Sequence, residues 1–438
     1  MDKLTVMIEK LAYGGNGVCR INGKVCFVPF SCPGDGVRLA VTAEKRSYLS
    51  ANIAELVIAS SHRIAPPCPL FGICGGCFWQ HIDYSQQLAA KQQILGESLR
   101  RVVMPDSDIT APALPSELPY GYRSRVQFKV QFADNRLKIG FYRFGTHRVE
   151  DLPPLGCPVA LPVVNKALNR LRAVLASFRE KNAIPAIKLE CGEREVLAVI
   201  SYTGRDTKAA ERFFRERQAD LSPLTGIHLQ VPNSRSLLKA YGDDRVSYSL
   251  PSPVQGQQPC LITYGPGGFA QINRDQNAAL LAQVRRMGCF QAHEQVLDLF
   301  CGNGNFSLPI ASQAGSVTGV EESRISIESA QHNSRLNGIS NTSFICDVAV
   351  GATRRWADSG RPCDTVILDP PRVGAVGLIP DICRLSPEKI IYVSCDPSTL
   401  ARDCGLLVAD GYSIEESVPV DMFPQTYHIE SITLLRRR

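Results

Sequence analysis

The chain has 438 residues, of which 44% are hydrophobic and 21% charged, and its formal net charge is +6. This length exceeds one ordinary domain and indicates two or three. No stretch reaches the roughly 18 consecutive apolar residues of a membrane-spanning helix. The first residues lack the basic and then apolar layout of a secretion signal. We therefore expect a cytoplasmic protein, monomeric and without a membrane partner; the modest charge permits a nucleic-acid partner without requiring one.

Short strands and glycine turns fill the first 58 residues. Turn signals lie at 14–17, 22–23 and 33–36, and apolar strands are expected at 25–28, 37–41 and 52–58. This spacing is typical of a small oligonucleotide-binding (OB-like) β-barrel, although a β-cap without a ligand has the same pattern. Aromatic side chains that could stack on RNA bases or lie in the core are Tyr13, Phe27 and Phe30.

The chain from 62 to 258 has a mixed pattern. Segments 62–83 and 120–258 are expected to form a central α+β domain, with a strand at 126–132 and helices at 168–178 and 208–218. Between them, 84–119 reads as a helix to about Val103 and then a linker with Pro105. The Pro- and Gln-rich stretch Pro251 to Pro259 is a plausible boundary before a last domain, 259–438.

Three of the sixteen cysteines, Cys68, Cys74 and Cys77, share one short loop. Disulfides are a poor explanation in the cytoplasm, whereas metal binding and catalysis are better ones. Cys157, in another Pro- and Gly-rich loop, is the best candidate for a fourth ligand. Four thiolates suit zinc or an iron–sulfur cluster, and zinc ribbons usually have two Cys-x2-Cys pairs, whereas this chain has one.

From about residue 262 onward, apolar strands alternate with helices. Strands are expected at 295–300, 316–320, 365–368 and 389–393. Continuous apolar strands separated by helices predict a parallel sheet covered on both faces, a doubly wound Rossmann-like α/β fold. Ligands of such sheets bind at the carboxyl ends of the strands.

A candidate cofactor site follows the first of these strands. Gly302 and Gly304 form a turn after Asp298, and the second strand ends at Glu321, about 20 residues on, where a carboxylate can bind ribose hydroxyls. The dinucleotide fingerprint needs three glycines, so this pattern favours S-adenosylmethionine, with a purely structural glycine turn as the alternative. After the third strand, Asp369 and two prolines would form a rigid rim beside the reactive end of the cofactor.

Cys395 follows the strand at 389–393 and should lie at the same edge as Asp369 and Glu321. A thiolate that adds to carbon 6 of uracil makes carbon 5 nucleophilic enough to accept a methyl group. We therefore expect Cys395 to be the nucleophile, with a lowered pKa in the complex with RNA and cofactor. The proton on carbon 5 then needs a base, for which we favour Glu430; His428 is a rival on chemistry alone.

Five motifs in order resemble the RNA uracil-5-methyltransferase family, in particular its 23S ribosomal RNA branch with a TRAM domain and an iron–sulfur cluster. They lie at 269–273, 298–302, 369–372, 394–403 and 422–430, and the resemblance covers nearly the whole chain. It implies a TRAM domain in the first 58 residues and packing of the helix in 84–119 against the catalytic domain. Asp396 stands where many relatives have Asn.

The resemblance also implies site roles. Cys395 and Glu430 would be catalytic, and Cys68, Cys74, Cys77 and Cys157 would hold a [4Fe–4S] cluster. The cofactor-binding residues would be Gln271, Phe300, Asn305, Glu321, Asp347 and Asp369. Ribosomal RNA is the favoured substrate and transfer RNA an alternative. A non-catalytic RNA-binding iron–sulfur protein is the alternative of another class, while cytosine-5 methylation is disfavoured because the additional Pro-Cys and Thr-Cys motifs are missing.

Overall fold

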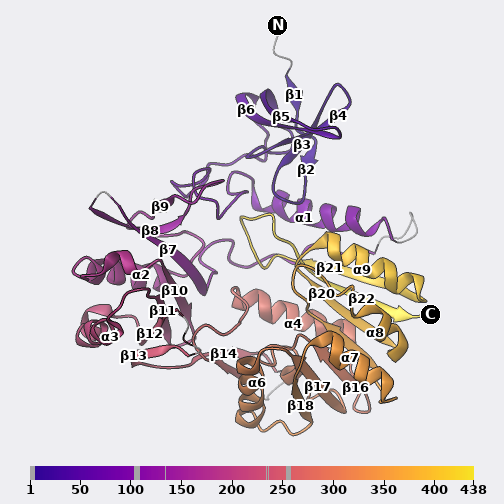
Figure 1. Ribbon diagram of the computed structural model, residues 1–438. Helices are drawn as coiled ribbons and strands as arrows, with labels where there is room; N and C mark the ends of the chain where they lie inside the picture. Colours follow the sequence, from indigo (N-terminus) through magenta and orange to yellow (C-terminus); the bar gives the residue numbers. More distant parts are fainter. Residues whose placement is uncertain (1–4, 103–108, 134, 233, 235, 253–257) are drawn as a thin grey trace.

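The computed structural model describes the chain except for residues 1–4, 103–108, 134, 233, 235 and 253–257. The expected end of the first helix at Val103, Pro105 of the linker and part of the Pro251 to Pro259 boundary therefore lie outside the described residues. Figure 1 shows three groups of elements, with the N-terminal strands at the top, α2 and α3 on the left and the large C-terminal sheet on the lower right. None of the helices in the described ranges is long and apolar enough to cross a membrane.

The N-terminal group is a six-stranded sheet with the order β1-β5-β6-β4-β3-β2. Its buried side chains, among them Ile8, Val28 and Val37, form a small core of their own. Strands β4, β5 and β6 match the three segments expected from the glycine turns, with β5 and β6 longer than expected, whereas β1, β2 and β3 were not predicted. Their bounds are Val6–Met7 (β1), Lys10–Leu11 (β2), Gly17–Ile21 (β3), Lys24–Val28 (β4), Gly36–Glu44 (β5) and Tyr48–Ile58 (β6).

The central group is a seven-stranded mixed sheet, β13-β12-β11-β10-β7-β8-β9, with α2 and α3 sharing its core. Helix α2 begins six residues before the expected start, with Pro162 in its first turn. Proline is tolerated there because the backbone N–H groups of the first turn have no partner within the helix. The elements are Arg125–Ala133 (β7), Arg136–Tyr142 (β8), Val149–Asp151 (β9), Pro162–Leu175 (α2), Lys181–Ala183 (η1), Ala186–Cys191 (β10), Val196–Ser201 (β11), Thr207–Glu216 (α3), Gln218–Leu221 (η2), Gly226–Gln230 (β12) and Leu238–Gly242 (β13).

The C-terminal group is a seven-stranded sheet, β18-β17-β16-β19-β20-β22-β21. Strands β18, β17, β16, β19 and β20 are parallel to one another. Strand β22 is antiparallel to its two neighbours, β20 and β21, so that β21 again runs in the direction of the first five. The bounds are Arg274–Gly288 (α4), Gln295–Leu299 (β16), Ser307–Ile310 (α5), Ser316–Glu321 (β17), Arg324–Leu336 (α6), Thr342–Cys346 (β18), Ala349–Asp358 (α7), Thr365–Leu368 (β19), Ile379–Leu385 (α8), Lys389–Ser394 (β20), Pro397–Ala409 (α9), Tyr412–Val420 (β21) and Glu430–Arg437 (β22).

Two segments from earlier in the chain complete this domain. Helix α1, Tyr84–Leu99, lies against α9 and β21, and its Leu95 and Leu99 enter the core beneath the sheet. The hairpin of β14, Val246–Leu250, and β15, Cys260–Tyr264, packs into the core beside α4. The predicted domain boundary near residue 258 falls between these two strands.

Candidate active site

The carboxyl edge of the parallel sheet gathers most of the expected site residues. Phe300 follows β16, Asp369 follows β19 and Cys395 follows β20, while Glu321 ends β17. Since these four strands are neighbours and parallel, their carboxyl ends meet along one line, as the alternation of strands and helices predicts.

The turn after β16 is built for close approach of a ligand. Phe300, Gly302 and Gly304 all have positive φ, of 69°, 55° and 90°, a conformation that glycine adopts without strain. A side chain at Gly302 would point into open space, whereas one at Gly304 would collide with Leu308. The backbone at Gly302 is therefore accessible to a ligand.

Buried carboxyl groups line this edge. Asp298 is fully buried, and its Oδ2 accepts a hydrogen bond from Ser307 while its Oδ1 has no partner among the described residues. Burial raises the pKa of Asp298 to about 7, and burial together with Asp298 raises the pKa of Asp369 to about 7. An unpaired buried carboxyl oxygen is costly unless a cation or donor reaches it, so this cluster suits a positively charged ligand such as a sulfonium.

The other expected cofactor residues occupy two sides of the turn. Asp347 follows β18, and its backbone N–H donates to the backbone carbonyl of Glu321 at 3.0 Å, so the ends of β17 and β18 hold these two residues side by side. Asp347 also pairs with Arg355. The Asn305 side chain exchanges hydrogen bonds of 2.8 and 2.9 Å with Asn277 and accepts one from Tyr248. Asn305 thus links the turn to α4 and β14, and Gln271 lies half-buried just before α4.

Cys395 and Glu430 face each other across one strand pair. Strand β20 pairs antiparallel with β22, and the last rung of the ladder joins Ser394 to Ser431. Continuing this register by one residue places Cys395 opposite Glu430, on the same face of the sheet because side chains alternate along each strand. Cys395 is half-buried and Glu430 is buried.

The pKa of Cys395 is raised in the protein alone. Burial, then the carboxylates of Glu430 and Asp369, raise it to about 12, whereas the expected lowering concerns the complex with RNA and cofactor. The pKa of Glu430 is also raised well above its ordinary value, by burial and by Asp369. Arg372 opposes both shifts. The proposed chemistry needs a thiolate, whereas burial and the neighbouring carboxyl groups favour the neutral thiol in the protein alone.

His428 has a different environment from Glu430. Its Nδ1 lies 3.3 Å from Nη2 of Arg372, and its ring packs 4.4 Å from that of Tyr427. Burial, together with nearby cations of which Arg372 has the largest effect, lowers the pKa of His428 to about 4. A neutral imidazole with such a low pKa is a weak proton acceptor, which argues against His428 as the base.

A residue of the N-terminal domain reaches this site, which no sequence pattern predicts. The Tyr13 hydroxyl donates to Oδ2 of Asp396 at 3.1 Å and lies 3.5 Å from the carbonyl oxygen of Cys395. Tyr13 is one of the aromatic candidates for stacking on RNA, and only the folded chain brings it to Cys395. Asp396 in turn caps α9, because its Oδ1 accepts from the N–H groups of Ser398 and Thr399.

The four expected metal-ligand cysteines lie in one region. The pKa of Cys74 is raised to about 11 by burial and by Cys157 and Cys68, and that of Cys77 to about 12 by burial and by Cys157 and Cys74. The thiols are therefore close enough to influence one another, and all sixteen cysteines are free. Nevertheless, within the described part of the chain no group of three or more such side chains is placed to hold a metal ion. The donor set is chemically suited to a cluster, and its arrangement is looser than a bound metal requires.

Comparisons with known proteins agree with this site. The model of the tRNA (uracil-5-)-methyltransferase family matches residues 83–438, and that of the TRAM domain of tRNA (uracil(54)-C(5))-methyltransferase matches 4–61. The chain is 33% identical over 436 residues to 23S rRNA (uracil(1939)-C(5))-methyltransferase RlmD from Pectobacterium atrosepticum, covering 98% of this chain and 93% of the relative.

A solved structure is similar over the full length. The tRNA (uracil-54, C5)-methyltransferase of Pyrococcus abyssi in complex with S-adenosyl-L-homocysteine is 25% identical, with a TM-score of 0.74, and the match covers 99% of this chain and 100% of that one. The family model spans far more than half of the chain, and the two matched regions include both the N-terminal sheet and the candidate active site. The chain therefore belongs to the RNA uracil-5-methyltransferase family.

Proposed function

We propose that the protein transfers a methyl group from S-adenosylmethionine to carbon 5 of a uridine in 23S ribosomal RNA. The observation that carries the proposal is the register of β20 and β22, which sets Cys395 opposite Glu430 at the edge where Asp369 also lies. The ribosomal substrate rests on the relative from Pectobacterium atrosepticum, whose name specifies 23S rRNA.

In this mechanism the Cys395 thiolate adds to carbon 6 of the uracil, and carbon 5 becomes an enolate carbon. The bound donor supplies an electrophilic methyl group, which carbon 5 takes from sulfur. Glu430 then removes the proton from carbon 5, and the electron pair left behind expels the Cys395 thiolate and restores the double bond. Arg372, the cation near both groups, stabilises their charged forms.

The donor would lie along the carboxyl edge of the sheet. We propose that Glu321 binds its ribose hydroxyls and that Asp347, beside Glu321, lies near its adenine. Phe300 and Gln271 would contact the same molecule, while Asn305 would contribute through the N–H that its contacts leave open. Asp369, beside Asp298, would face the sulfonium, which needs an anionic neighbour.

The four cysteines are proposed to hold a [4Fe–4S] cluster through Cys68, Cys74, Cys77 and Cys157. Their mutual influence on pKa supports it, and cluster binding would draw the loops together. Anaerobically purified protein should be brown and contain about four iron atoms per chain, and Cys77→Ser should lower the iron content. Zinc in place of iron would contradict this assignment.

We propose a chain of three domains. Residues 1–58 form the RNA-binding domain, 62–83 and 120–258 form the central domain, and 84–119 joins the catalytic domain at 259–438. We also propose that the protein acts as a monomer in the cytoplasm, where its RNA substrate is found.

One experiment tests the function. The protein is incubated with labelled S-adenosylmethionine and, separately, unmodified 23S rRNA and tRNA transcripts, and the methylated position is mapped. We expect 5-methyluridine in 23S rRNA with the wild type and none with Cys395→Ala. Methylation of tRNA alone would mean that the substrate is transfer RNA and not 23S rRNA. RNA binding without methyl transfer would favour a non-catalytic protein.

A further inference from the structure

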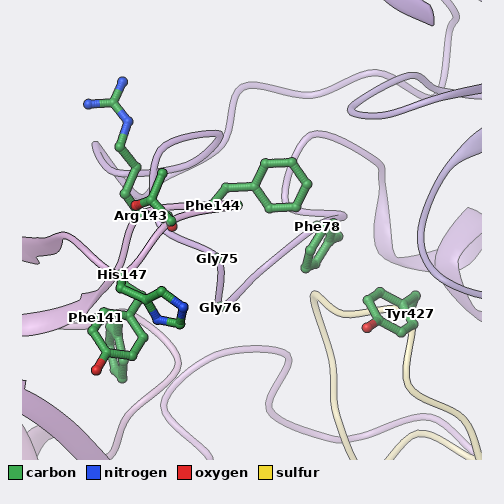
Figure 2. Close-up of a pocket in the computed structure, with 11 residues that line it drawn as sticks. Gly75, Gly76, Phe78, Phe141, Arg143, Phe144, His147 and Tyr427 are labelled. Atoms are coloured by element: carbon green, nitrogen blue, oxygen red, sulfur yellow. Dashed lines mark hydrogen bonds between the residues drawn. The ribbon is translucent and has the colours of Figure 1, made fainter. Parts of the chain in front are cut away.

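An open pocket of about 510 Å³ lies beside the active site, between the loop of the cysteines and the turn that joins β8 to β9. Figure 2 shows the rings of Phe144, Phe78 and Tyr427 on one side of Gly75 and Gly76 and that of His147 on the other. The volume is within the range of about 300–1,000 Å³ that is usual for small-ligand pockets. The complete lining is Gly75, Gly76, Phe78, Phe141, Tyr142, Arg143, Phe144, Gly145, Thr146, His147 and Tyr427.

The pocket walls are aromatic and accessible. Phe144 is 45% and Tyr142 38% exposed, although both are large hydrophobic side chains. The ring of Phe144 lies 5.5 Å from that of Phe78, which lies 5.1 Å from that of Tyr427. Phe144 is exposed, whereas Phe78 and Tyr427 are half-buried and pack edge to face with their neighbours. Aromatic rings that reach solvent in this way offer a stacking surface for the π-face of a base.

The backbone keeps this surface in place. The N–H of Gly75 donates to the carbonyl of Tyr142 at 3.1 Å, and the N–H of Phe144 donates to that of Ile73 at 2.8 Å. Gly75 and Gly76 have no side chain to fill the space between the walls. The turn and the cysteine loop are thus joined, and the pocket is formed before any ligand arrives.

The charge around the pocket suits a polyanion. Among the described lining residues none is acidic, whereas Arg143 is present and Lys129 lies 5.4 Å from the ring of Tyr142. Arg143 is partly neutralised by Glu150 at 3.3 Å but remains exposed. Cations beside aromatic rings are the combination that binds the phosphates and bases of single-stranded RNA.

The pocket is also connected to the nucleophile. Tyr427 forms part of its wall, and its ring lies 6.0 Å from that of Tyr13, whose hydroxyl lies 3.5 Å from the carbonyl oxygen of Cys395. A uridine extruded to reach Cys395 leaves its neighbours in the strand unstacked. We propose that this pocket binds the unstacked base of a nucleotide adjacent to the target uridine, an inference that rests on the proposed function.

The test uses the full-length protein and an unmodified 23S rRNA transcript. Phe144→Ala should weaken RNA binding about five-fold or more, as loss of one stacked base does, and Phe144→Tyr should bind like the wild type. Phe132→Ala is the matched control, because Phe132 belongs to the same sheet but pairs with Leu137 near the opposite end of β8.

Ultraviolet crosslinking of the wild type provides a readout that does not depend on any variant. We expect residues 141–147 or Tyr427 to crosslink to a nucleotide next to the methylated uridine. Wild-type affinity in Phe144→Ala together with crosslinks only elsewhere would overturn the pocket assignment while leaving methylation intact. Absence of methyl transfer by the wild type would instead contradict the proposed function itself.

Discussion

The hydroxyl of Tyr13, from the N-terminal sheet, donates a 3.1 Å hydrogen bond to Asp396, the residue that follows Cys395. Asp396 simultaneously caps α9, so Tyr13 joins the N-terminal domain to the loop that carries Cys395. The contact also buries the tyrosine, and its pKa is raised by burial and by Asp396. The N-terminal domain is therefore in direct contact with the loop of the proposed nucleophile.

Tyr13→Phe should slow methyl transfer at saturating RNA by roughly five-fold, the equivalent of about 1 kcal/mol for one hydrogen bond. The reason is that Asp396 loses a donor and the loop around Cys395 is held less firmly. RNA affinity should change little because the ring remains. Tyr48→Phe, in the same sheet but paired with Phe27, is the control, and equal rates for both variants would refute a positioning role.

The affinity for S-adenosylmethionine should rise with pH. Asp298 and Asp369 have pKa values of about 7 in the protein alone, so below that pH they are protonated and attract the sulfonium weakly. Above it both are anionic, and by linkage the bound cation lowers their pKa further. Calorimetric titration from one pH unit below to one above should show the increase.

Asp369→Asn should weaken binding of the cofactor and flatten this pH dependence. Asp364→Asn is a suitable control, because Asp364 precedes β19 at the opposite end of the same strand. A dissociation constant that does not change with pH in the wild type would show that these carboxyls do not face the sulfonium.

Cys395 should become more reactive when the methyl donor binds. Its pKa of about 12 in the protein alone arises from burial and two carboxylates, and a bound sulfonium would offset their charge. Alkylation by iodoacetamide, followed at Cys395 by peptide mass spectrometry, should show a lower midpoint pH with S-adenosylmethionine than without it. Cys289, which is exposed, provides an internal control whose rate should not change.

Glu430→Gln should stop the reaction after methyl transfer. Glutamine cannot accept the carbon 5 proton, so Cys395 remains bonded to the methylated ring. We expect a protein–RNA adduct that survives denaturing electrophoresis, with one methyl group per complex. His428→Asn should not accumulate it, and an adduct in that variant alone would make His428 the base.

The α/β domain could be predicted well from the sequence because its strands are continuous apolar runs. The candidate site residues come directly after the carboxyl ends of these strands. Gly302, Asp369 and Cys395 could be placed at one edge from pattern alone. The contact of Tyr13 with Asp396 could not, since it joins residues 383 positions apart and no local pattern encodes it. The raised pKa of Cys395 could not be predicted either, because its largest cause is the burial of the thiol, which no local pattern encodes.

Helix α1 is joined to the catalytic domain by a buried ion pair between Lys91 and Asp421. Both side chains are almost fully buried, with Nζ and Oδ1 2.5 Å apart, and the Tyr84 hydroxyl also donates to Asp421. Lys91 donates further to the carbonyl of Phe423. The pair thus fixes the start of the segment that leads to His428 and Glu430.

Lys91→Met should lower the free energy of unfolding by about 3–5 kcal/mol, because it leaves the carboxylate of Asp421 buried without its cation. Denaturant titration measures the loss, and Lys91→Met combined with Asp421→Asn should recover part of it. Arg324→Ala breaks an ion pair with Glu328 in which both side chains are exposed, and it should cost less than about 1 kcal/mol. Equal effects of the two single variants would mean that the Lys91–Asp421 pair does not stabilise the docking of α1.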